Sequence, residues 1–116
     1  MKRLLLLSII LLTACGYPKN DSDKFFHEDG LLREIDTYKK GVLSKVVMYS
    51  EDGTLEQIQF YKKGVLSKVA MYSEDGTLEQ IQSYKKGVVS KYEFFREDGT
   101  TEQVDTYENG VYKNSQ

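Results

Sequence analysis

Residues 54–76 read TLEQIQFYKKGVLSKVAMYSEDG, and residues 31–53, LLREIDTYKKGVLSKVVMYSEDG, are nearly a copy of them. Two series of glycines mark the period of 23 residues. The first series is Gly30, Gly53, Gly76 and Gly99, and the second is Gly41, Gly64, Gly87 and Gly110. A fixed period of this length is typical of repeat proteins, in which each unit is one supersecondary element. The last unit is partial and more divergent, as terminal units that cap a repeat array often are.

Each unit contains two runs of about eight residues that are rich in Val, Ile, Leu, Tyr and Phe and contain no proline. Such runs favour β-strands. Glu-Asp-Gly and Lys-Lys-Gly alternate between the runs as turn signals, with Glu-Asn-Gly at the last turn. A helix is disfavoured, because a glycine arrives every 11 or 12 residues. The sequence therefore predicts an all-β fold, an elongated antiparallel β-meander of 23-residue hairpin units that form a single twisted sheet.

The odd period constrains which side chains share a face, because side chains alternate between the two faces of a strand. Equivalent residues stay on one face if Lys-Lys-Gly is a three-residue loop and Ser-Glu-Asp-Gly a four-residue loop. This assignment predicts one face with Leu55, Tyr61, Val65, Val69, Met71, Leu78 and Tyr84. The opposite face then carries Glu56, Ile58, Phe60, Leu66, Lys68, Ala70 and Tyr72. Neither face is wholly polar, so we expect thin cores rather than a closed globule.

The first 14 residues have the form of a secretory signal peptide. Lys2 and Arg3 are followed by an apolar run over residues 4–12, interrupted only by Ser8. A helix that spans a bilayer needs about 20 apolar residues, so this run is too short to act as an anchor by itself. The sequence predicts that the segment directs export of the chain.

Residues 12–15, Leu-Thr-Ala-Cys, resemble the bacterial lipobox, whose cysteine receives lipid before the signal is cleaved. The resemblance implies acyl chains on Cys15, and two or more chains hold a protein stably at a membrane. Gly16 stands where an Asp commonly signals inner-membrane retention, which implies the outer membrane if the organism is Gram-negative. An ordinary signal peptide that ends near a cysteine by chance is the alternative.

Three segments follow from these patterns. Residues 1–14 are the predicted signal peptide, and residues 15–24 are the predicted lipidated N-terminus and flexible tether, which is polar and holds the only proline. Residues 25–116 are the predicted repeat domain. The whole chain has a net charge of −2, and the signal carries two positive charges, so the mature part is acidic and gives no reason to expect nucleic-acid binding.

The repeats resemble the MORN-like family, specifically the bacterial YwqK-type variant that is called the antitoxin component of a toxin–antitoxin pair. The resemblance covers about residues 25–113 and rests on two steps: aromatic-x-x-Asp-Gly-x-Leu over residues 72–78 and Tyr-Lys-Lys-Gly over residues 84–87. The chain departs from the family at Ser67-Lys68-Val69 and in having no tryptophan. The resemblance implies a β-repeat architecture, while the export signal argues against a cytoplasmic antitoxin.

No pattern in the sequence predicts catalysis, a cofactor or a metal site. His27 is the sole histidine and lies beside Glu28 and Asp29, where we expect a solvated turn residue. The paired acids of the Glu-Asp-Gly turns suggest calcium, which takes six to eight oxygen ligands. Equivalent turns are two strands apart, about 9–10 Å, so neighbouring pairs cannot easily share an ion. We expect ordinary exposed turns and a protein that is not an enzyme.

A meander brings all turns of one kind to the same long edge. We therefore expect a basic rim of Lys39, Lys40, Lys62, Lys63, Lys85 and Lys86 opposite an acidic rim formed by the Glu-Asp pairs. The basic rim either orients a partner or meets anionic headgroups, or it simply keeps a thin sheet soluble. A row of tyrosines, Tyr38, Tyr61, Tyr84 and Tyr107, is either a packing ladder or a surface for a protein partner.

The sequence as a whole predicts a lipid-anchored envelope protein whose non-catalytic β-repeat module binds a protein partner in the manner of an immunity protein or antitoxin. A structural lipoprotein without a specific ligand, and a module that binds phospholipid headgroups through the basic rim, are the alternatives.

Overall fold

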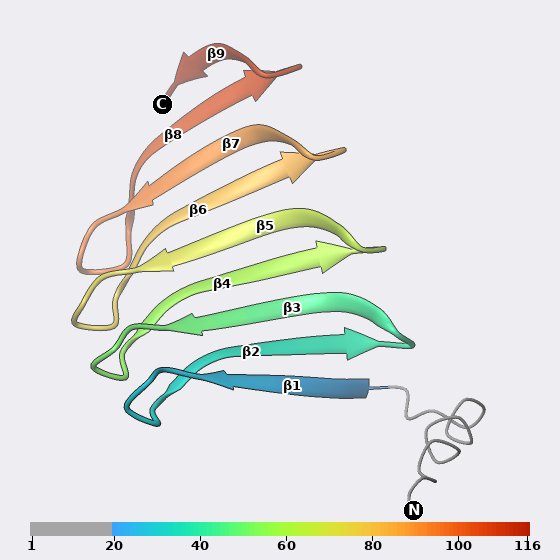
Figure 1. Cartoon of the computed structure of the whole chain (residues 1–116). Coiled ribbons are helices and arrows are strands. Elements are labelled where there is room, and N and C mark those ends of the chain that lie inside the picture. Colours follow the sequence, from blue (N-terminus) through green and yellow to red (C-terminus); the bar gives the residue numbers. More distant parts are fainter. Residues whose placement is uncertain (1–19) are drawn as a thin grey trace, which may run out of the picture.

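The computed structural model describes residues 20–116, and this part of the chain forms nine β-strands in one open sheet (Figure 1). The strands are β1 (Asn20–Phe26), β2 (Leu32–Lys39), β3 (Val42–Tyr49), β4 (Leu55–Lys62), β5 (Val65–Tyr72), β6 (Leu78–Lys85), β7 (Val88–Phe95), β8 (Thr101–Glu108) and β9 (Val111–Ser115). Each strand pairs antiparallel with the next one in the chain. The predicted all-β meander of hairpin units is confirmed. The predicted signal peptide and Cys15 lie outside the described residues.

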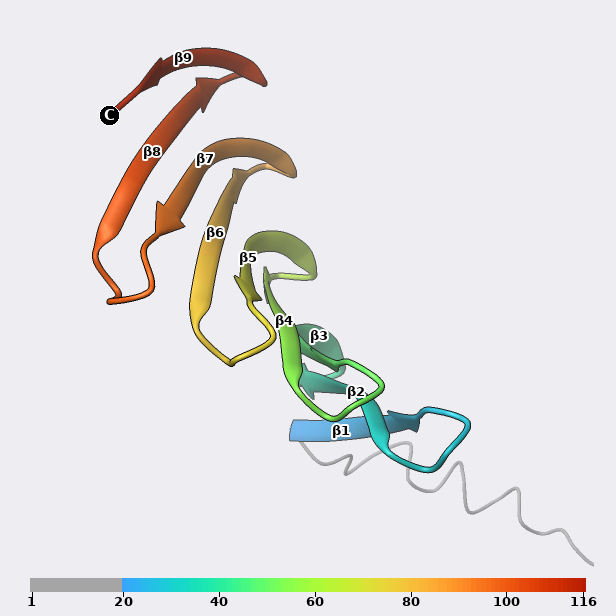
Figure 2. The ribbon, with the colours of Figure 1, turned by 90° about the vertical axis from the view of Figure 1, so that its left-hand side faces the viewer.

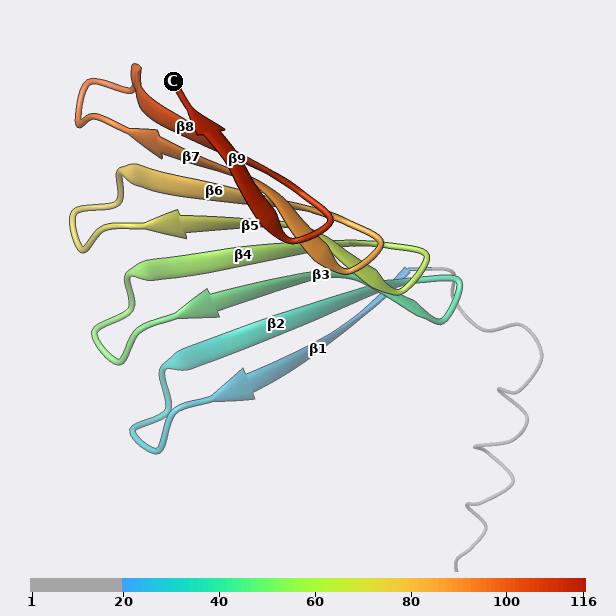
Figure 3. The ribbon, with the colours of Figure 1, turned by 90° about the horizontal axis from the view of Figure 1, so that it is seen from above.

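The sheet is a single layer that twists along its length (Figures 2 and 3). It measures 64 × 35 × 18 Å, and the strands stack along the long direction. Among the described residues, the buried hydrophobic side chains are Val46, Val69 and Ala70, each 6% exposed. The expected thin core is confirmed, because no second layer covers either face in this part of the chain. The described residues also include no helix long and apolar enough to cross a membrane.

The Lys-Lys-Gly turns are two-residue loops, so the predicted three-residue loop is wrong. Lys39 pairs with Val42, which leaves only Lys40 and Gly41 in the loop. Both residues have positive φ, 51° and 80°. Two positive φ angles in succession define a type I′ turn, whose twist matches that of the flanking strands. Lysine adopts this conformation less readily than asparagine, which takes the same position in the last turn as Asn109 with φ 53°.

A β-bulge accompanies each of these tight turns in the three complete units. In the β4–β5 hairpin, Phe60 pairs with Lys68 and Tyr61 with Leu66, so Ser67 is the extra residue. The Ser67 hydroxyl donates a hydrogen bond of 3.1 Å to the Phe60 carbonyl across the hairpin. Ser44 and Ser90 make the equivalent bonds, 3.1 and 3.2 Å long. The serine of the Ser-Lys segment is therefore the extra residue of each bulge, and its hydroxyl adds a hydrogen bond to the facing strand.

The Glu-Asp-Gly turns are three-residue loops, so the predicted four-residue loop is also wrong. The Ser50 N–H donates to the Thr54 carbonyl at 2.8 Å, which closes the loop around residues 51–53. The Gly53 N–H donates to the Ser50 carbonyl at 3.0 Å, as in a β-turn. Glu56 then forms a second bulge, because Met48 pairs with Gln57 and Tyr49 with Leu55.

The bulges decide which side chains share a face. One face, here called the tyrosine face, carries Tyr61, Val69, Met71 and Tyr84, as predicted, and the opposite one, the lysine face, carries Ile58, Phe60, Lys68, Ala70 and Tyr72, also as predicted. Residues between a bulge and its turn were assigned to the wrong face: Leu66 belongs to the tyrosine face, and Leu55, Val65 and Leu78 to the lysine face. An extra residue shifts the alternation by one position, which exchanges the two faces beyond it.

The sheet begins earlier than the sequence predicts. Residues 20–24 were assigned to the tether, but they belong to β1 and pair with β2. These residues are polar, and an edge strand in a one-layer sheet needs only backbone pairing to be held. His27 is in the first turn as expected, but it is half-buried rather than solvated, and its Nε2 lies 3.2 Å from the Tyr49 carbonyl oxygen.

Candidate functional site

The structure places the four predicted tyrosines in one row on the tyrosine face. Tyr38, Tyr61, Tyr84 and Tyr107 occupy the same position in β2, β4, β6 and β8, opposite Leu43, Leu66, Val89 and Tyr112 respectively. All four are half-buried. They therefore pack across the sheet and still present part of each ring to solvent.

Glutamines hold two of these tyrosines in place. The Tyr61 hydroxyl donates to Gln59 Oε1 at 2.8 Å, and Gln59 Nε2 donates to Gln57 Oε1 at 2.6 Å. The same two hydrogen bonds occur one unit later, where they join Tyr84 to Gln82 at 2.8 Å and Gln82 to Gln80 at 2.7 Å. Side chains fixed in this way lose little conformational freedom when a partner binds. These glutamines are not among the residues predicted from the sequence, although they recur at the 23-residue period.

The tyrosine face changes character along the sheet. At β1 and β2 it carries Asp23 opposite Asp36, with Glu34 two residues before Asp36, where the next two units have only valine or glutamine. A hydrogen bond with Asp36 and partial burial raise the pKa of Glu34. Partial burial, with the nearby Asp36 and Asp23 charges, also raises the pKa of Tyr38. This end of the face is therefore crowded with negative charge.

The other end of the tyrosine face is aromatic. The Tyr92 ring meets Tyr107 edge-on at 5.5 Å between centroids, and Tyr107 meets Tyr112 in the same way at 5.6 Å. Phe94 stacks beside Tyr92 at 6.4 Å. Tyr112 is 51% exposed, so the aromatic cluster continues to the surface at the last strand. The face thus runs from acidic at β1 and β2 to mainly aromatic at β7 to β9, where the carboxylate of Asp105, opposite Tyr92, accepts from Gln103.

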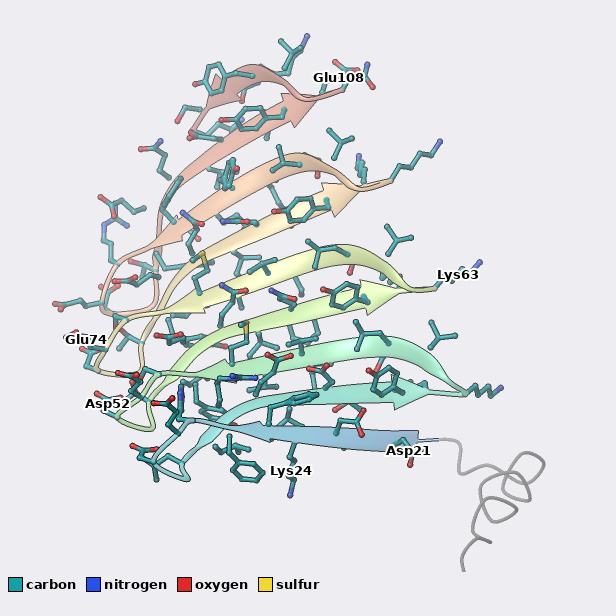
Figure 4. All side chains as sticks on the ribbon, viewed as in Figure 1. Asp21, Lys24, Asp52, Lys63, Glu74 and Glu108 are labelled. Atoms are coloured by element: carbon teal, nitrogen blue, oxygen red, sulfur yellow. The ribbon has the colours of Figure 1, made fainter. Side chains whose placement is uncertain are left out.

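The two kinds of turn lie on opposite long edges of the sheet, as predicted. Figure 4 shows Asp52 and Glu74 at one edge and Lys63 and Glu108 at the other. The Lys–Gly turns succeed one another along a nearly straight line in all three ribbon views (Figures 1 to 3). An exposed valine follows each of the three Lys–Gly turns and the Asn109–Gly110 turn; the four are Val42, Val65, Val88 and Val111, 45–64% exposed. The basic rim is therefore a straight edge that carries apolar side chains as well as lysines.

A groove of about 1260 Å³ lies along the basic rim. Eight lysines line it: Lys39, Lys40, Lys62, Lys63 and Lys85 from the rim, and Lys45, Lys68 and Lys91 from the strands. Among the residues that the structure describes, no Asp or Glu lines this groove. We call it the lysine groove. It concentrates positive charge in a chain whose net charge is −2.

The three strand lysines form a column across the lysine face. The register places them in one row with Thr37, Phe60, Ser83 and Thr106. Lys68 Nζ lies 5.3 Å from the centre of the Phe60 ring, a cation–π contact. Lys91 Nζ lies 3.5 Å from a Glu93 carboxylate oxygen, so one lysine of the column is partly neutralised. Sequence reasoning placed Lys68 on this face but did not recognise the column, which the 23-residue spacing of the three lysines could have revealed.

Internal hydrogen bonds occupy the carboxylates of the acidic turns. Asp52 Oδ1 accepts from the Ser50 hydroxyl, from the Thr54 hydroxyl at 2.8 Å and from the Thr54 N–H at 3.0 Å. These bonds, led by the one from Ser50, lower the Asp52 pKa to about 2. Asp75 repeats the arrangement, and its pKa is lowered in the same way. No group of three or more His, Cys, Asp or Glu side chains within residues 20–116 is arranged to hold a metal ion.

These turns predict a specific loss of stability in acid. A carboxylate with a lowered pKa stabilises the fold above its ordinary pKa of 3.8, and the contribution is lost as the pH falls toward the folded value of about 2. We expect the urea midpoint to fall between about pH 4 and pH 2. The triple variant Asp52→Asn/Asp75→Asn/Asp98→Asn keeps an acceptor oxygen but cannot titrate, so its midpoint should fall less. Equal acid losses in the two proteins would contradict this assignment.

Comparison with known proteins identifies the architecture but no family. No protein-family model and no curated protein sequence matches the chain. Solved structures resemble it, among them accessory secretory protein 1, 2 and 3 of Streptococcus pneumoniae (TM-score 0.58, 16% identity, 78% of this chain) and the glycosylation-associated Gap123 complex of Streptococcus agalactiae (TM-score 0.61, 18% identity, 87% of this chain). The chain spans only 18–19% of the matched chains, and identities this low show a shared fold alone.

Proposed function

We propose that the chain is a lipid-anchored, non-catalytic envelope module that binds a protein partner through its tyrosine face. The observation that supports this most is the row of four half-buried tyrosines, two of them held by glutamine hydrogen bonds, on a face that no other layer covers in the described residues. Tyrosine contributes large contact area with few rotatable bonds, which suits a binding surface. The two structural neighbours are described as complexes of secretory or glycosylation-associated proteins, which is in keeping with a partner for this chain.

The gradient along the tyrosine face indicates the chemistry of that partner. Asp23, Glu34 and Asp36 at β1 and β2 favour a basic patch, whereas Tyr92, Tyr107 and Tyr112 near the other end favour an apolar or aromatic one. Complementary charge at one end would fix the orientation of the partner, and the aromatic end would supply most of the buried apolar area.

The fold also supports an orientation at the membrane. Asn20 opens β1 at the basic rim, where it pairs with Lys39. Cys15 lies five residues before Asn20, and five residues span at most about 18 Å. Acyl chains on Cys15 would therefore hold the straight basic edge, with its lysines and exposed valines, close to the lipid. Lysines near an anionic leaflet add about 1 kcal/mol each, so the edge would lie toward the membrane and the acidic rim away from it.

Photo-crosslinking in cells tests the proposed partner site. A benzophenone amino acid in place of Tyr84 is an aromatic substitution on the tyrosine face, and the same substitution at Phe60 is its control on the lysine face. Both side chains are half-buried, so they differ mainly in the face they occupy. We expect one protein product of defined mass from position 84 and none from position 60.

The yield from position 84 should fall at least tenfold when Tyr61 and Tyr107 are changed to alanine, since both lie in the same row. Equal crosslinking yields from positions 60 and 84 would contradict the proposed face. A yield from position 84 that stays the same when Tyr61 and Tyr107 are alanine would contradict it too. The absence of any protein product would instead favour a structural lipoprotein without a specific ligand.

A further inference from the structure

We propose that the lysine groove binds a flexible linear polyanion built of phosphate groups, lying across the strands along the basic rim. This inference does not rest on the protein-binding proposal. Tyr61, Tyr84 and Tyr107 contribute to the groove lining, but the register places the lysine column on the opposite face of the sheet from the tyrosine row. The groove is strongly and uniformly basic. Eight lysines and no carboxylate line the groove among the described residues, although acidic side chains outnumber basic ones in the whole chain.

The lysines of the groove are spaced in lines across the strands. Lys45, Lys68 and Lys91 occur on alternate strands, so successive lysines of the column are about 9–10 Å apart. The rim lysines recur with the same spacing, because they belong to the same 23-residue units. The groove thus has a line of cations on its floor and another at its edge. A long anion can meet several of them at once, whereas a small anion meets one or two.

The residues between the column lysines are mostly hydroxyl-bearing. Thr37, Ser83 and Thr106 place hydroxyl-bearing side chains in the row of the column, as cross-strand neighbours of its lysines. A phosphate has oxygens on several sides, so it can accept from an ammonium and a hydroxyl together. Phe60 is the one aromatic side chain in this row, and Lys68 lies over its ring. Three tyrosines also line the groove, but the register places them on the face opposite the column; they are Tyr61, Tyr84 and Tyr107. Proteins that hold single-stranded nucleic acids stack successive bases on aromatic rings, so the column itself favours a polyanion without bases.

The shape of the sheet favours a flexible chain over a lipid surface at this site. The column lies on a face of the sheet, inward from the turns, since Lys68 is three residues beyond Val65, the first residue of β5. A flat bilayer that meets the straight edge would contact the rim and leave the column open. A flexible polymer can follow the groove along the twisted sheet. Substitution of the column lysines should therefore weaken binding of a polymer but not contact with a membrane.

The test is binding of inorganic polyphosphate to the full chain in a neutral detergent, measured by calorimetry at several salt concentrations. The variant Lys45→Gln/Lys68→Gln/Lys91→Gln should bind at least tenfold more weakly. Its slope of log affinity against log salt should be smaller by about 2, from about 0.7 per lost phosphate contact. The matched control Lys24→Gln/Arg33→Gln/Lys113→Gln removes the same charge outside the groove and should lose less than threefold. Urea midpoints check that both variants are folded, and the pair Lys68→Gln and Lys24→Gln replaces them if either is not.

Three comparisons can overturn the proposal. Equal losses in the two triple variants would mean that only net charge matters. Polyglutamate that binds as tightly as polyphosphate would point to an acidic polypeptide instead. Micelles containing phosphatidylglycerol that bind with the same dependence on Lys45, Lys68 and Lys91, while polyphosphate does not bind, would point to a lipid surface. Crosslinking from Tyr84 is a separate measurement, so failure of the polyanion proposal is distinguishable from failure of the protein-binding one.

Discussion

The variant Val69→Asp should lose at least about 3 kcal/mol of unfolding free energy, because it places a charge at a buried position without a partner. Val69 is 6% exposed, and it lies in the central strand β5 between Gln59 of β4 and Gln82 of β6. A one-layer sheet has few such positions, so each buried side chain carries a large share of the stability. Val46, the equivalent residue one unit earlier, is equally buried and should respond in the same way.

The matched control is Val65→Asp, which makes the same substitution in the same strand. Val65 is 49% exposed and follows the Lys–Gly turn, so this variant should lose under about 1 kcal/mol. Urea unfolding followed by circular dichroism measures both. Where Val69→Asp is too unstable to fold, Val69→Ala removes two methyl-sized groups and should still cost about 1.6 kcal/mol. Similar losses for Val65→Asp and Val69→Asp would contradict the described burial.

The repeat period was sufficient to predict the architecture. Glycines at a constant spacing, with strand-forming runs between them, left an antiparallel meander as the simplest arrangement, and the sheet has that order. The positions of the rims and of the tyrosine row follow from the same period, because equivalent residues of a repeat array recur at one place along the sheet. These features depend on topology alone, which local sequence patterns specify well.

The positions of residues near the turns could not be predicted from period-two alternation. Ser67 and Glu56 are each the extra residue in one strand of a pair. Neither residue type is specific to a β-bulge, so the sequence alone does not mark these positions. One informative signal was available: the last turn contains Asn109 and Gly110, a pair that strongly favours a two-residue type I′ turn. Applied to the equivalent Lys–Gly pairs, it would have shown that these loops have two residues.

The lysine groove illustrates a second limit of sequence reasoning. The six rim lysines were found because they are adjacent in the turns, whereas Lys45, Lys68 and Lys91 are isolated within apolar strands. Only the register shows that they share a row and a groove with the rim. The polar strand β1 was missed for a related reason. Its hydrogen bonds to β2 come from the backbone, which no side-chain pattern reports.

The proposed anchor carries the largest expected effect on the behaviour of the protein. Replacement of Cys15 by alanine removes the only thiol in the chain and so the only site for a thioether-linked lipid. Two or more acyl chains hold a protein at a membrane almost permanently, whereas a polybasic edge alone binds weakly and reversibly. The Cys15→Ala chain should therefore behave very differently from the wild type in cells, while the fold of residues 20–116 stays the same.

The most direct measurement is the intact mass and membrane partitioning of the chain expressed in a bacterium, compared between wild type and Cys15→Ala. The account predicts that the wild type lacks residues 1–14, gains the mass of its acyl chains and sediments with membranes in high salt, and that the variant gains no acyl mass. A wild-type chain that is unlipidated, retains its first 14 residues and stays in the soluble fraction would contradict it. The basic edge would then have no anchor beside it, and a cytoplasmic antitoxin-like role would replace the envelope module.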